Sequence, residues 1–196
     1  MMEKQESKIN HFLSFLNFII FLLFFCFLIK ITQVFIKNLK SQEGFKLWVF
    51  FLGLVSPLIF YTFVANLNNI YDKIQRFFFR QTFLYLAIPS LLIVLWLGYF
   101  ILPKVLEKGF NKDIFVFLGG TIFMAHLIFV ASGSRGNNLF SFFNYLFILS
   151  LLYTLNLILL GFYFNISFNL PLLNILTEGI KAGGMLVRSI WVEIFS

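Results

Sequence analysis

The chain has 196 residues, of which 60% are hydrophobic and 12% are charged, and its net charge is +7. Soluble domains are about 45 to 50% apolar and about 25% charged, so this composition excludes an ordinary soluble protein and indicates an integral membrane protein. The basic residues lie between apolar runs, where they contact anionic headgroups, so the positive charge does not imply nucleic acid binding.

Five apolar runs are long enough to cross a bilayer, whose hydrocarbon core requires about 20 residues of helix. The predicted spans are residues 12–36, 47–65, 82–102, 114–131 and 139–164. The first run is longer than the core of a signal peptide and lacks a small-residue cleavage site, so we expect an uncleaved span. No linker or second domain separates the runs, which predicts a single helical membrane domain over residues 1–196.

Prolines interrupt two of these spans. Pro57 lies in the middle of the second span and Pro89 lies seven residues into the third. Proline removes a backbone donor and clashes one turn back, so we expect kinks, and Ser56 could bond the carbonyl that Pro57 frees. Such kinks line sites in some transporters but are more often packing features.

Two segments carry charge at helical spacing. Residues 66–81 carry Asp72, Lys73, Arg76 and Arg80 among apolar residues at helical spacing, which predicts a short amphipathic helix on the membrane surface. Residues 174–195 hold Glu178, Lys181, Arg188 and Glu193, too many charges for a crossing that faces lipid. We therefore expect an amphipathic C-terminal helix at the interface and, in total, an all-α bundle of five transmembrane helices.

The distribution of Lys and Arg predicts the orientation. With five spans, these residues are in excess on the side that holds the C-terminus, which favours a cytoplasmic C-terminus. We expect the chain to lie in the inner membrane of a bacterium.

The residues needed for catalysis are scarce. All eight acidic residues lie outside the apolar cores, and the single cysteine and two histidines do not form a usual metal site. No phosphate-binding glycine loop, zinc-protease motif or nucleophile elbow is present. We expect a protein that is not an enzyme and that needs neither a cofactor nor a metal ion.

The candidate site lies around the loop between the fourth and fifth spans. His126 is the one ionisable residue in its span, and it either bridges helices, with Asn144, Ser141 or Thr62 as the expected partner, or binds a ligand. Arg135 either contacts headgroups or forms a ligand site with backbone amides. The predicted binding residues for a headgroup or partner are His126, Gly133, Arg135, Gly136, Asn144 and Tyr145.

This segment resembles the Yip family. The stretch Ala125-His126-Leu127, the turn Gly133-Ser134-Arg135-Gly136 and residues Phe140 to Tyr145 are similar to the family's central segment. The matching positions are His126, Gly133, Arg135, Gly136, Phe142 and Tyr145. The resemblance implies a five-span membrane protein, and eukaryotic members of that family associate with Rab-type GTPases.

Two functions follow from these observations. The first is a non-enzymatic scaffold or interaction protein, with anionic lipid headgroups and other membrane proteins as partners. The second is a small transporter or a subunit of a transport complex, because the two prolines and the polar residues of the fifth span could surround a site at the midplane.

Overall fold

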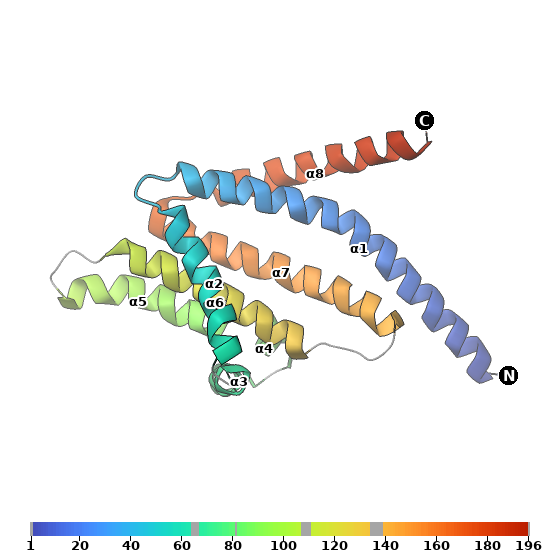
Figure 1. The fold of residues 1–196 in the computed structure, drawn as a ribbon, viewed down its shortest axis with the longest axis horizontal. Helices are drawn as coiled ribbons and strands as arrows, with labels where there is room; N and C mark the ends of the chain where they lie inside the picture. The colour runs from blue at the N-terminus through green and yellow to red at the C-terminus, as the bar shows by residue number, and fades with distance from the viewer. Residues whose placement is uncertain (1, 64–66, 81, 107–110, 134–138, 196) are drawn as a thin grey trace.

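The computed structural model describes residues 2–63, 67–80, 82–106, 111–133 and 139–195, and this part of the chain is helical (Figure 1). The helices are α1 (Met2–Ser41), α2 (Leu47–Phe63), α3 (Leu67–Phe78), α4 (Thr82–Ala87), α5 (Ser90–Leu106), α6 (Lys112–Gly133), α7 (Leu139–Phe168) and α8 (Leu172–Phe195). Within these residues, three stretches are long and apolar enough to cross a membrane, namely Phe12–Ser41, Lys112–Ser132 and Phe142–Phe168. The prediction of an all-α integral membrane protein is thus confirmed.

The second and third predicted spans correspond to shorter apolar helices. α2 has 17 residues, so it is roughly 26 Å long against a hydrocarbon core of about 30 Å. In the third predicted span, residues 82–102, the proline does more than kink the helix: one helix ends at Ala87 and a new one begins at Ser90. Pro89 lies in the break.

The longest helices extend beyond their predicted bounds. α1 continues five residues past the predicted end at residue 36 and reaches Ser41. α7 continues past residue 164 to Phe168, where Asn169 adopts a left-handed conformation with φ of 54° and ends the helix. The side chain of Asn165 donates to the carbonyl of Leu170 at 2.5 Å, which fixes the turn into α8.

α8 returns antiparallel to α1 and packs along it through two glycines (Figure 1). Gly179 faces Ile31 and Gly183 faces Phe27, and an added Cβ would lie 2.7 Å and 2.8 Å from the Cα atoms of those residues. Small residues one turn apart allow such close helix packing in membranes. Ile180, next to Gly179 in the sequence, is exposed.

α2 crosses α6 at a second glycine contact. A Cβ on Gly53 would lie 2.2 Å from the carbonyl oxygen of Phe117. Next to it, the hydroxyl of Ser56 donates to the carbonyl of Gly53 at 2.9 Å and lies 3.0 Å from the hydroxyl of Thr121. In a regular helix the N–H of residue 57 would donate to the carbonyl of Gly53, but Pro57 has no N–H. The hydroxyl of Ser56 takes its place, so the predicted role of Ser56 is confirmed.

Phenylalanines fill the core where α1, α2, α6 and α7 meet. Phe35, Phe115 and Phe164 are almost completely buried. Phe45 packs edge-on against both Phe164 and Phe168. Other phenylalanines are exposed along the outer faces, as expected for side chains in contact with lipid.

Candidate functional site

The break between α4 and α5 exposes backbone groups that a continuous helix would pair. Pro89 has no N–H, so the carbonyl of Tyr85 loses its usual partner one turn later. The N–H of Ser90, which would bond the carbonyl of Leu86, donates instead to the side chain of Gln75 at 2.9 Å. Unpaired backbone groups inside a membrane are costly, so other side chains must replace these bonds.

Gln75, on α3, supplies most of the replacements. Its amide nitrogen donates to the carbonyls of Tyr85 at 2.8 Å and Ile88 at 2.5 Å. Its amide oxygen accepts from both the N–H and the hydroxyl of Ser90. A glutamine amide has two donors and two acceptor positions, so the fully buried Gln75 is saturated.

His126, on α6, bonds the remaining carbonyl. Its Nε2 lies 3.0 Å from the carbonyl of Leu86, which can only accept, so Nε2 carries the proton. Its Nδ1 lies 3.0 Å from the hydroxyl of Tyr71 and accepts from it. Burial raises the pKa of the Tyr71 phenol, which keeps its proton available for donation. Both ring nitrogens of this fully buried imidazole are thus bonded within the protein.

The short helix α3 positions two of these side chains. Tyr71 and Gln75 are four residues apart, so they lie on one face of α3, and both are buried. Ile70 and Phe77, on the other side of the helix, are exposed. The sequence predicts the amphipathic helix, but its buried stripe is a tyrosine and a glutamine that hold the break of the next helix. We call the group Tyr71, Gln75, Tyr85, Leu86, Ile88, Ser90 and His126 the break network.

The expected partners of His126 were wrong. Asn144 accepts a hydrogen bond from the side chain of Asn17 on α1 at 2.8 Å. Thr62 donates to the carbonyl of Leu58 on its own helix. The side chain of Ser141 is outside the described residues, and both nitrogens of His126 are already bonded elsewhere.

Two of the predicted binding residues, Asn144 and Tyr145, make hydrogen bonds with residues other than His126. Tyr145 donates to the carbonyl of Ala131 at 3.3 Å, which joins the ends of α6 and α7. Gly133 is the last residue of α6. Arg135 and Gly136 lie outside the described residues, so the anion site expected at this turn stays a prediction.

Asn156 is a further buried polar residue near the break. The prediction that the polar residues of α7 face the interior is confirmed for Asn156 and Ser150. The amide nitrogen of Asn156 donates to the carbonyl of Leu152, whereas its amide oxygen has no partner in the described part of the chain. Asn156 lies on the face of α7 between Leu152, which packs near Ala87, and Leu159, which lies near Pro89.

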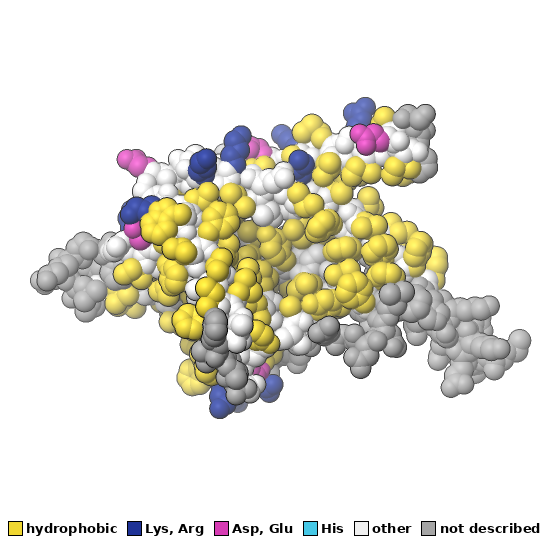
Figure 2. All heavy atoms as spheres, in the orientation of Figure 1, with side chains coloured by type: hydrophobic (Ala, Val, Ile, Leu, Met, Phe, Trp, Pro, Cys, Tyr) yellow, Lys and Arg dark blue, Asp and Glu magenta, His cyan; other side chains and the backbone are white. Residues whose placement is uncertain are grey.

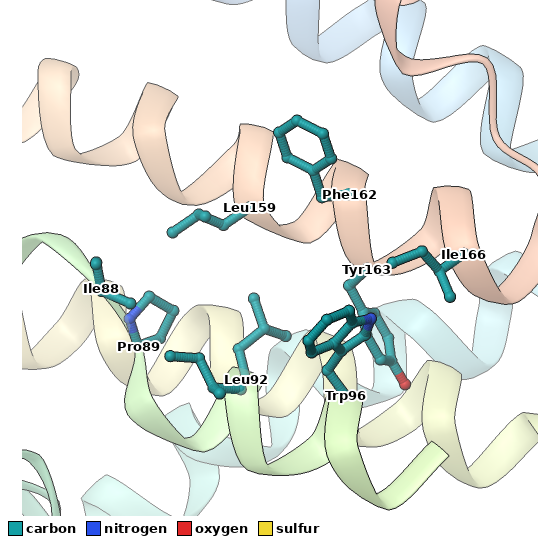
Figure 3. Close-up of a pocket in the computed structure, with 9 residues that line it drawn as sticks. Ile88, Pro89, Leu92, Trp96, Leu159, Phe162, Tyr163 and Ile166 are labelled. Atoms are coloured by element: carbon teal, nitrogen blue, oxygen red, sulfur yellow. The ribbon is translucent and has the colours of Figure 1, made fainter. Parts of the chain in front are cut away.

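An apolar groove of about 270 Å³ lies between α5 and α7 beside the break (Figure 3). Its walls are Ile88, Pro89, Leu92, Ile93, Trp96, Leu159, Phe162, Tyr163 and Ile166. One turn of a helix about 10 Å in diameter occupies on the order of 400 Å³, so the groove is too small for a helix. It suits a lipid acyl chain and offers little to a polar solute.

The described residues contain no group of three or more His, Cys, Asp or Glu side chains that could hold a metal ion. No protein-family model, curated protein or solved structure matches the chain. Function is therefore inferred from the residues and their geometry.

Sequence reasoning did not identify Gln75, which bonds the carbonyls freed at the break, or Tyr71, which bonds His126. One signal was present: a glutamine lies four residues after a tyrosine on a helix next to a proline-containing span. A buried glutamine can bond two carbonyls at once, so this pattern marks a side chain that can replace backbone bonds.

Proposed function

We propose that this chain is a non-enzymatic multi-pass membrane protein that acts as a scaffold for other membrane components. The observation that supports this best is the saturation of the break network. Gln75 uses all four of its hydrogen-bonding positions and His126 uses both ring nitrogens on neighbouring groups. These two side chains have no hydrogen-bonding position left for a solute, and a satisfied buried network stiffens the helices that it joins.

The scaffold crosses the bilayer five times in this proposal, through α1, α2, the α4–α5 pair, α6 and α7, with α8 at the interface. Figure 2 shows charged side chains along the edge formed by α1 and α8 and again near α3, with apolar surface between. Because this edge runs along α1, the support for the crossings comes from the apolar length of α1, α6 and α7 and from the shorter apolar helices α2 and α5. Exposed residues on the first edge include Lys37, Lys40, Lys181 and Arg188. In this proposal the C-terminus lies on the cytoplasmic side of a bacterial inner membrane.

The position of α8 can be tested with two cysteines. After replacement of the native Cys26 by serine, Glu178→Cys and Glu193→Cys each place one thiol on an exposed site of α8. The proposal predicts that a membrane-impermeant maleimide labels both from the same side of the membrane. Labelling from opposite sides would mean that α8 crosses the bilayer and that the count of five spans is wrong.

The partners in this proposal are anionic lipids and other membrane proteins. The resemblance to the Yip family, which the comparisons leave untested, is consistent with a role in protein association. It adds no residue to the break network beyond His126.

Transport is the second candidate function, and one observation favours it. The amide oxygen of Asn156 is a buried acceptor without a partner in the described residues, and Leu159, one turn further along α7, lines the groove beside Pro89. Transporters often build sites from broken helices and buried polar groups near the midplane. Purified chain in proteoliposomes is expected to take up no more of a panel of ions, sugars and amino acids than empty vesicles. Uptake that Asn156→Leu abolishes would favour the transporter instead.

A further inference from the structure

The outward side of α3 carries a basic hollow. Arg76, Phe79, Arg80 and Tyr85 line a depression of about 290 Å³. The guanidinium of Arg76 lies 5.5 Å from the centre of the Tyr85 ring, and its Nε donates to the carboxylate of Asp72 at 2.9 Å. Arg80 is exposed at the rim. Tyr85 therefore belongs to the break network through its backbone and to this hollow through its ring.

Two aromatic residues, Phe79 and Tyr85, line the hollow itself, and the same segment carries further exposed phenylalanines. Phe77 is 84% exposed and Phe78 is 46% exposed, next to Arg76 in the sequence. Burying a phenylalanine side chain stabilises by about 1.5 to 3 kcal/mol relative to water, so these rings belong in an apolar environment. Basic and aromatic residues together on a short amphipathic helix are typical of the boundary between headgroups and acyl chains.

We propose that this hollow binds the phosphate of an anionic phospholipid, with Arg76 and Arg80 as its donors. Guanidinium groups suit phosphate because they present several N–H donors in one plane. Phe79, which lines the hollow beside the two arginines, would lie against the acyl chains of the same lipid, which is why a lipid fits the site better than a soluble phosphate. The carboxylate of Asp72 competes with the phosphate for Arg76. This site does not depend on the proposed scaffold role, so its loss would leave that role untouched.

The test measures lipid that stays bound to the purified full-length chain. The chain is released from nanodiscs that contain phosphatidylcholine and phosphatidylglycerol, and retained lipids are counted by native mass spectrometry. A direct hydrogen bond to a charged group contributes a factor of about ten or more, and Arg76 already shares its donors with Asp72, so Arg76→Gln with Arg80→Gln is expected to reduce retained phosphatidylglycerol about tenfold. Asp72→Asn is expected to increase it.

The matched control is Lys181→Gln with Arg188→Gln, which removes the same charge from exposed positions on α8. It is expected to change retention by less than about twofold. If the two double variants lost equal amounts of retained phosphatidylglycerol, or if Asp72→Asn lost some, the proposed site would be refuted. Retention would then reflect general attraction between charges. Inorganic phosphate in excess should leave the lipid bound, and displacement of the lipid would reassign the hollow to a soluble phosphate.

Discussion

Replacing Gly53 with alanine is expected to destabilise the protein by about 3 kcal/mol, measured as the free energy of unfolding in a denaturant titration of the detergent-solubilised chain. The added Cβ would lie 2.2 Å from the carbonyl oxygen of Phe117, and both atoms belong to the backbones of crossing helices. Neither helix can relieve the overlap by turning a side chain. α2 and α6 must move apart, and the contact between Ser56 and Thr121 is lost with them.

The control for this prediction is Gly98→Ala on α5. A Cβ there would lie 3.7 Å from Cδ1 of Leu102, which is an ordinary van der Waals contact. Because alanine is the better helix former, this change is expected to stabilise the protein by up to about 1 kcal/mol. If both variants changed stability in the same direction and by similar amounts, the tight crossing of α2 and α6 would be refuted.

Replacing Gln75 with leucine is expected to cost about 3 kcal/mol. Leucine nearly matches glutamine in volume and in helix propensity, so the loss comes from the hydrogen bonds. The carbonyls of Tyr85 and Ile88 and the N–H of Ser90 lose their partner, and each unsatisfied buried group costs about 1 to 3 kcal/mol, reduced where water can enter. The stability loss should appear with faster hydrogen exchange at the amide of Ser90.

Gln33→Leu is the control for Gln75→Leu, because it makes the same substitution at an exposed position. Gln33 is exposed on α1 and accepts one exposed hydrogen bond from Lys30, so its loss should change stability by less than about 0.5 kcal/mol. An amide of Ser90 that stays as protected in Gln75→Leu as in the unmodified chain would show that Gln75 does not hold the break.

Apolar length and charge spacing predicted most of the helices, because membrane helices are governed by length and composition. The same reasoning predicted that Ser56 bonds the carbonyl freed by Pro57, since the two residues are neighbours on one helix. A break at Pro89 was harder to foresee. Whether a helix kinks or ends at a proline depends on partners for its freed carbonyls, and here they come from two other helices, α3 and α6.

The partners of His126 were predicted wrongly, and the contacts of α8 with α1 were not predicted at all. Proximity in the sequence suggested Asn144 across the next turn, but the imidazole points towards α3 and α4. On α8 the apolar residues dominated the pattern, whereas the close contacts with α1 are made by Gly179 and Gly183. Glycine carries no hydrophobic signal, so it is easily overlooked when packing faces are assigned from apolar periodicity.

The proposed scaffold role is tested most directly by the mass of the particle that contains the chain in its own membrane. The chain is isolated with surrounding lipid, without detergent, and the intact particle is weighed by native mass spectrometry. The proposal predicts a fixed stoichiometry of this chain with another membrane protein and no bound polar solute. A particle that holds this chain alone with a stoichiometric polar solute, lost in Asn156→Leu, would contradict it.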